Sequence, residues 1–188
     1  MLKRLLTSAA VACTLFGVPA LADYIRPSDD HIRILKAVQS KGIVVSINDR
    51  EACDHETSGM YSYGHTRAGA RYADFIVCQD NGRPGGPIAS WTENDLDTIR
   101  HEAAHIIQDC IDGKIANMSL DTVFDDPKKL AQFAQKAGLT GAQVDHIIET
   151  YADEPRDVVM REIEAYAVAK MNNPGYQAQL IMKTCSNI

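Results

Sequence analysis

The N-terminal half of the chain alternates between short apolar segments and longer polar ones. Apolar positions recur with helical spacing in residues 28–38, and Ser28 is positioned to cap this first helix. Residues 43–47 are apolar and β-branched, which is typical of a buried strand, and residues 71–78 alternate as a second strand would. Between the strands, residues 50–70 are mostly polar and contain glycine, so we expect a loop or a weak hairpin there.

The pattern becomes helical after the Gly/Pro-rich segment 81–87. Overlapping capping boxes at 90–93 and 92–95 predict a helix that begins near residues 91–93 and continues to about residue 110. Further helices are predicted to start at Asp126-Pro127, at Thr140 and at Glu154-Pro155, and a short last helix is expected before Cys185. The pattern therefore predicts an α+β fold, with a small N-terminal β-sheet followed by a mostly helical part.

A chain of 188 residues with 45% hydrophobic residues suffices for one compact domain. Its first residues are basic, then apolar from Leu5 to Val18, then small up to Ala22, which is typical of a secretory signal peptide cleaved after Ala22. An uncleaved membrane anchor is disfavoured, because the apolar run is shorter than the roughly 20 residues that span a bilayer. We therefore expect a signal peptide at 1–22, a single exported domain at 23–188, periplasmic or secreted, and no membrane span after cleavage.

Removal of residues 1–22 takes Cys13 away and leaves four cysteines: Cys53, Cys78, Cys110 and Cys185. An even number of cysteines in an exported protein indicates two disulfides, for which three connectivities exist. The order along the chain favours Cys53 with Cys78 and Cys110 with Cys185. Buried free thiols are the alternative.

The charge of the chain limits its partners. The formal net charge is −6, and residues 1–22 contain two basic residues and no acidic one. The mature chain thus has 17 basic and 25 acidic residues, a net charge of −8. Such an acidic surface argues against nucleic acid or an anionic membrane as a partner.

The helix predicted to end near residue 110 contains the sequence His101-Glu102-Ala103-Ala104-His105. Residues four apart lie on the same face of a helix, so His101 and His105 can direct both imidazoles at one ion. Neutral imidazole is a good zinc ligand, and zinc lowers the pKa of water toward about 7. Glu102 can take a proton from that water, which makes it the expected catalytic base. The motif predicts one Zn²⁺ per chain.

The two histidines could instead be ordinary polar residues on the exposed side of a helix. Apolar residues on the same segment, among them Ile99 and Ile106, indicate that much of this helix is buried, which disfavours that alternative. The presence of Glu102 also favours catalysis, because a purely structural pair of histidines does not require it.

A catalytic zinc commonly has three protein ligands. The metzincin continuation His-x-x-Gly-x-x-His is excluded, because Gln108 and Ile111 stand at its glycine and histidine positions. The alanine-rich helix predicted over residues 161–169 offers Glu162 and Glu164. These two residues are about 200° apart around a helix, so only one of them can face the metal.

Glu162 is the preferred third ligand. It shares a stripe with Ala165 and Ala169, and small residues allow this helix to approach the histidine helix closely. Glu164 falls on a more polar stripe with Arg161 and is kept as the alternative. Either glutamate could instead form an ion pair with a neighbouring arginine.

His101-Glu102-x-x-His105 followed by Glu162-x-x-Ala165 resembles the pattern of the gluzincin metallopeptidases, especially the CAAX endopeptidases and heat-shock membrane peptidases. The resemblance covers these two helices, Tyr166 stands where that group has an aspartate, and the chain lacks the group's membrane helices. It implies a zincin-like fold and a zinc-dependent endopeptidase that acts on a peptide or protein. It also implies that the strand before the histidine helix, residues 72–77, binds extended substrate, with the loop 82–87 at the edge of the cleft.

Stabilisation of an oxyanion requires a further hydrogen-bond donor. Tyr166, Tyr151 and His146 are candidates by residue type, although core tyrosines and a surface histidine are the alternative interpretation. His55 lies near a cysteine and acidic residues, but it has no partner at a recognisable ligand spacing for a second metal cluster.

The sequence therefore predicts an exported zinc-dependent metallopeptidase in which Glu102 activates the attacking water. The alternative from another class is a non-catalytic zinc-containing protein of the envelope or the exterior, with a binding or accessory role. Zinc content combined with a Glu102→Gln comparison distinguishes the two.

Overall fold

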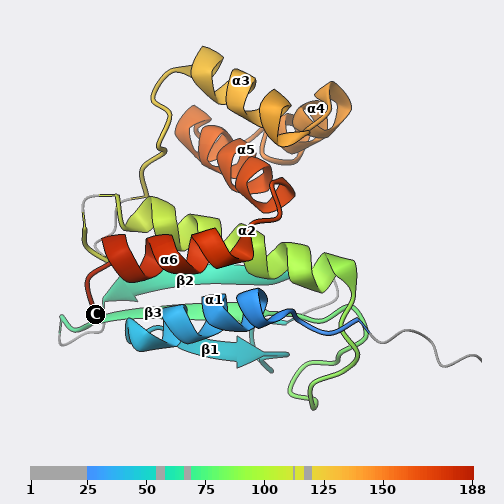
Figure 1. The fold of residues 1–188 in the computed structure, drawn as a ribbon, viewed down its shortest axis with the longest axis vertical. Helices are drawn as coiled ribbons and strands as arrows, with labels where there is room; N and C mark the ends of the chain where they lie inside the picture. Colours follow the sequence, from blue (N-terminus) through green and yellow to red (C-terminus); the bar gives the residue numbers. More distant parts are fainter. Residues whose placement is uncertain (1–24, 54–57, 66–68, 112, 117–119) are drawn as a thin grey trace, which may run out of the picture.

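The computed structural model of the protein describes residues 25–53, 58–65, 69–111, 113–116 and 120–188. In this part of the chain, three strands and six helices follow one another in the order α1, β1, β2, β3 and then α2 to α6 (Figure 1). The fold is α+β with the strands in the N-terminal half, as the sequence predicts. The predicted signal peptide and His55 lie outside the described residues. None of the described helices is long and apolar enough to cross a membrane.

The helices begin at the capping residues that the sequence predicts. They are α1 (Asp29–Ser40), α2 (Glu93–Asp109), α3 (Pro127–Ala137), α4 (Gly141–Thr150), α5 (Arg156–Lys170) and α6 (Pro174–Thr184). Ser28, Thr92 and Thr140 each accept a backbone hydrogen bond at the start of a helix. Of the two overlapping capping boxes, the one between Thr92 and Asp95 is present.

The sheet contains β1 (Val44–Ile47), β2 (Gly59–His65) and β3 (Arg71–Val77) in the order β1-β3-β2. The central strand β3 is parallel to β1 and antiparallel to β2. Residues 59–65 are therefore a regular edge strand, within a segment for which the sequence predicts only a loop or a weak hairpin. The glycines weaken the local strand pattern of this segment, whose backbone pairing within the sheet is with β3.

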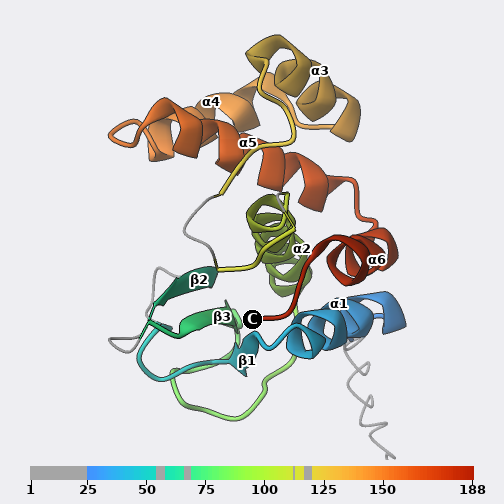
Figure 2. The ribbon, with the colours of Figure 1, turned by 90° about the vertical axis from the view of Figure 1, so that its left-hand side faces the viewer.

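The helices form layers above the sheet (Figure 2). Helices α1 and α2 pack against the sheet, and α6 packs on both of them. Helix α5 lies across α2 on the side away from the sheet, and α3 and α4 pack on α5. The main hydrophobic core joins the sheet to α1, α2 and α6, and it includes Ile34, Phe75, Ile99, Ile106 and Ile181. A second hydrophobic cluster joins α3, α4 and α5, so the contact between α2 and α5 connects two separately packed parts.

Both predicted disulfides are present, Cys53 with Cys78 and Cys110 with Cys185. The first links the end of β3 to the segment that follows β1. The second links the end of α2 to the end of α6, and its Cys110 follows the candidate metal-binding motif by five residues. Two disulfides are typical of proteins in oxidising compartments.

The two disulfides should contribute unequally to stability. Cysteines 75 positions apart close a longer loop than cysteines 25 positions apart. The Cys110–Cys185 bond therefore restricts the unfolded chain more, and its removal should destabilise the protein more. We expect the Cys110→Ser/Cys185→Ser variant to lose about 4.5 kcal/mol of unfolding free energy and Cys53→Ser/Cys78→Ser about 3.5 kcal/mol. Urea unfolding of both double variants measures the difference, and the reverse order would contradict this account.

Candidate metal centre

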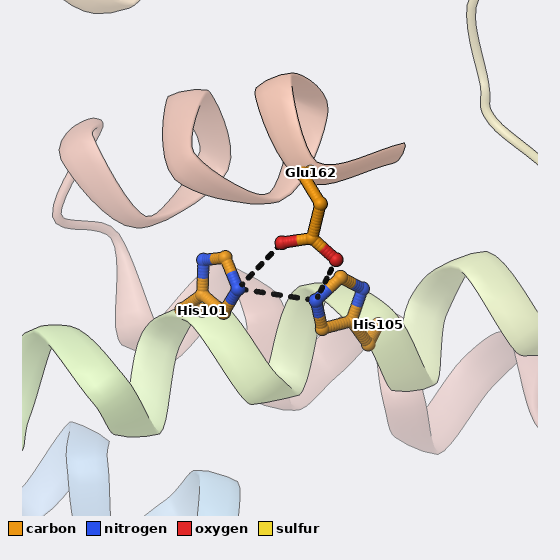
Figure 3. A group of neighbouring side chains, drawn as sticks. All are labelled: His101, His105 and Glu162. Carbon is orange, nitrogen blue, oxygen red and sulfur yellow. Dashed lines mark hydrogen bonds and ion pairs between the residues drawn. The ribbon is translucent and has the colours of Figure 1, made fainter. Parts of the chain in front are cut away.

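Two helices supply the side chains of the candidate metal centre. His101 and His105 lie one turn apart on α2, and Glu162 lies on α5. In Figure 3 both imidazoles extend from α2 toward α5, and the carboxylate of Glu162 reaches down between them. The small residues predicted to permit this close approach, Ala165 and Ala169, are buried at 0% and 3% exposure.

The three side chains bring their possible ligand atoms close together, all within 4.8 Å of one another, and we call this group of three residues the triangle. The Nε2 atoms of His101 and His105 are 3.1 Å apart. Glu162 places Oε2 3.3 Å from the first and Oε1 3.5 Å from the second. Zinc bonds of about 2.0–2.1 Å in a tetrahedron separate neighbouring ligand atoms by about 3.4 Å. The distance between the two imidazole nitrogens, and the distance from each of them to the nearest oxygen of Glu162, are thus close to the spacing of ligands around one zinc ion.

The hydrogen bonding of the centre also fits a cation. Glu162 Oε2 is buried and has no hydrogen-bond partner among the described residues, although it faces an imidazole nitrogen. A buried carboxylate oxygen without a partner is costly unless a cation or a proton donor satisfies it. The donor set of two imidazoles and one carboxylate is one that zinc accepts.

The charges of these groups depend on one another. Burial favours the neutral acid, but the close contacts with His101 and His105 hold the pKa of Glu162 well below its usual range. Burial by itself would lower the pKa of His105, yet hydrogen bonding to Glu162 raises it above its usual value. The negative charge of Glu162 therefore favours a proton on His105, which a divalent cation would displace.

His105 has a second hydrogen bond on the side away from Glu162. Its Nδ1 lies 2.8 Å from Oε1 of Gln108, which is one turn further along α2. Metal-binding histidines usually donate their other ring N–H to such an acceptor. In the sequence, Gln108 serves only to exclude the metzincin pattern. Its spacing of three residues from His105 is the signal that could identify it as a partner of this histidine.

Glu102 lies beside the triangle and is 7% exposed. Its Oε2 accepts a hydrogen bond of 2.7 Å from the backbone N–H of Tyr61 on β2. Its Oε1 has no hydrogen bond within the described part of the chain, and Glu102 lines a cleft next to His101. The carboxylate is thus oriented by one oxygen and can accept a proton with the other.

The cleft beside the triangle has a volume of about 410 Å³. The start of β2, the first half of α2, the α3–α4 connection and the end of α5 line it. Gly59 is required at its rim, because a Cβ there would collide with the side chain of Thr98 on α2. Most of the lining side chains are polar, including Asn94, Asp97, Gln143 and Lys170.

Two of the three predicted oxyanion donors lie in this cleft. Tyr151 and Tyr166 both line it, and the ring of Tyr166 packs 4.3 Å from that of His101 between centroids. Burial, and then the charge of Glu162, raise the pKa of both phenols, so that each stays protonated and able to donate. His146 is exposed on α4 and does not line the cleft, so it is not placed to donate to an oxyanion there.

Glu164 points away from the two histidines. It is 3% exposed and accepts backbone hydrogen bonds from Val123 and Phe124, in the segment before α3. The segment before α3 covers the side of α5 on which Glu164 lies. The ion pair of Arg161 is with Asp157 and involves neither glutamate.

The prediction that the strand at residues 72–77 binds substrate is also wrong. β3 is the central strand: β2 pairs with it along residues 71–77 and β1 along residues 74–77, so most of its backbone groups are not available to a peptide. β2 is the edge strand, and its first residues line the cleft. The loop 82–87 does not line the cleft, because it packs against Asn48 and Arg50 after β1.

Comparisons of the chain with protein-family models, with curated proteins and with solved structures find no match. The geometry of the site is therefore the basis for the functional inference. Within the described ranges, His101, His105 and Glu162 are the group of three His, Cys, Asp or Glu side chains that could share a metal ion.

We predict one zinc ion per chain, lost or greatly weakened in His101→Ala and in His105→Ala. Because only the folded protein presents the triangle, zinc at about 100 times its dissociation constant should stabilise the parent by about 2.7 kcal/mol. Both variants should lack this increment. Elemental analysis and thermal unfolding with and without zinc test it, with His146→Ala as a control that behaves like the parent.

Substitutions of the two glutamates of α5 should have different effects on zinc affinity. Glu162→Gln removes the charge that faces both imidazoles and should weaken zinc binding, whereas Glu164→Gln should leave zinc affinity unchanged. Competition with a chromogenic chelator measures both dissociation constants. Loss of zinc in Glu164→Gln alone would reverse the assignment of the third ligand.

Proposed function

We propose that the protein is an exported, zinc-dependent metallopeptidase with a zincin-like arrangement of its two metal-binding helices. The observation that carries this proposal is the triangle of His101, His105 and Glu162 next to a cleft that His101 and Glu102 line. A bound zinc ion would supply Lewis-acid chemistry there and lower the pKa of water toward about 7. The two disulfides support an oxidising compartment and agree with the predicted signal peptide.

Glu102 is the proposed general base. The hydrogen bond from Tyr61 N–H holds one of its oxygens, so the other can accept a proton from water and transfer it to the leaving amine. Helix α2, which carries this carboxylate, packs against the sheet on one side and against α5 on the other, so the orientation requires no conformational change. The protonated phenols of Tyr151 and Tyr166 are the proposed donors to the developing oxyanion.

An extended peptide is the proposed substrate, and the edge of β2 is its proposed binding surface. Ser58 O accepts from Cys78 N on the β3 side, and backbone groups alternate in direction along an antiparallel strand. The N–H groups of odd-numbered residues, such as Tyr61, therefore point away from β3 toward the cleft. A peptide can add to such an edge as a further strand, which would lay its backbone past Glu102.

Glu102→Gln tests the proposal, because an amide has nearly the same shape but cannot take the proton from water. We expect the variant to keep its fold and its zinc and to cleave an unbiased peptide library at least about 100-fold more slowly than the parent. Mass spectrometry of the digests and elemental analysis measure both quantities. Equal cleavage by the two proteins would refute the mechanism, and a zinc-loaded parent that cleaves nothing would favour the accessory role.

A further inference from the structure

Gln108 is a buried polar residue whose role is separate from ligation and from catalysis. Its side chain lies between α2 and α5 and is 2% exposed. A side-chain amide has two donors and one acceptor oxygen, and burial requires that partners be found for them within the protein. The partners of Gln108 are His105 on its own helix, the backbone of α5 and the carboxylate of Glu164.

The backbone partner determines the orientation of the amide. Gln108 Nε2 donates to the carbonyl oxygen of Arg161 at 3.0 Å, and a carbonyl oxygen can only accept. The amide oxygen must then be the atom that faces His105 Nδ1 at 2.8 Å. Because this oxygen also only accepts, the proton between the two residues has to be on Nδ1 of the histidine.

In the neutral imidazole of His105, which is the form that binds a metal, a proton on Nδ1 leaves Nε2 with its lone pair directed at the triangle. Nε2 is the atom that lies 3.1 Å from His101 and 3.5 Å from Glu162. The carbonyl that orients Gln108 belongs to Arg161, the residue immediately before Glu162. One buried amide therefore contacts a histidine ligand directly and holds the backbone next to the carboxylate ligand.

His101 has no equivalent partner. Its Nδ1 is buried and without a hydrogen bond in the described part of the chain, and its ring is held by packing against Tyr166. No hydrogen bond to Nδ1 thus orients the ring of His101 from the side away from the triangle. The orientation of the centre depends correspondingly more on His105 and its partner.

We propose that Gln108 is the positioning residue of the metal centre, which sets the tautomer of His105 and holds α5 so that Glu162 meets it. This inference rests on the proposed zinc site for its consequence, but the tautomer is a property of the protein without metal. Partners of this kind typically change metal affinity by about 10–100-fold when they are removed.

Gln108→Met tests the proposal, because methionine keeps the length and packing of the side chain but has neither amide group. Gln177→Met is the matched control. Gln177 is also 2% exposed and donates its Nε2 to a backbone carbonyl of α2, that of Arg100, without contact to a proposed ligand. Both variants lose a buried amide, and only one should alter the metal centre.

The first readout is the imidazole N–H spectrum of the metal-free parent by nitrogen-15 NMR. We expect a slowly exchanging proton on Nδ1 of His105, which is kept in Gln177→Met and lost or broadened in Gln108→Met. An unprotonated Nδ1 in the parent would overturn the proposal without recourse to any variant. This readout stands even if the parent binds no zinc, an outcome that would remove the proposed function alone.

The second readout is the zinc dissociation constant, obtained by chelator competition, together with the visible spectrum of the cobalt-substituted protein. Gln108→Met should bind zinc about 10–100-fold more weakly than the parent and show an altered cobalt spectrum. Gln177→Met should match the parent in both. Equal zinc affinity in all three proteins, or equal weakening in both variants, would reduce Gln108 to an ordinary buried amide.

Discussion

The burial of Glu162 between α2 and α5 is the constraint on which the rest of the site depends. Its side chain is 13% exposed, and the carboxylate of Glu102 lies nearby with similarly little access to solvent. Two carboxylates in a buried place are costly unless positive charge accompanies them. Two imidazoles supply such charge only when protonated, whereas a divalent ion in the triangle supplies it with both imidazoles neutral. The fold is thus more favourable with a cation there.

The position of α5 is controlled from both sides. Toward α2, the side chains of Arg100 and Gln108 each donate to a backbone carbonyl of α5, those of Ala169 and Arg161. Because these acceptors are backbone atoms on either side of Glu162, they hold the helix itself rather than one rotamer. Away from α2, the hydrophobic cluster with α3 and α4 packs on the other face of α5. The outer helices therefore help to hold Glu162 in place.

The elements that could be predicted from sequence are those defined by neighbours in the chain. Helix α2 begins at Thr92 because Thr92 and Asp95 satisfy each other's backbone groups, an interaction within four residues. β2 was not recognised as a regular strand, because Gly59 and Gly64 weaken the local pattern and its partner β3 lies beyond a turn. The burial of Glu164 has no local signal either, since the segment that covers it comes 40 residues earlier.

The sequence by itself determined the two histidines, their shared helical face and the adjacent glutamate, because the period of an α-helix places residues four apart on one side. It also indicated both disulfides through the number and order of cysteines. Only the tertiary structure decided that Glu162 faces the histidines, that β2 and not β3 borders the cleft, and that Gln108 joins α2 to the backbone beside Glu162. These features arise from contacts between distant segments, and no local pattern specifies how two helices and a sheet edge are packed together.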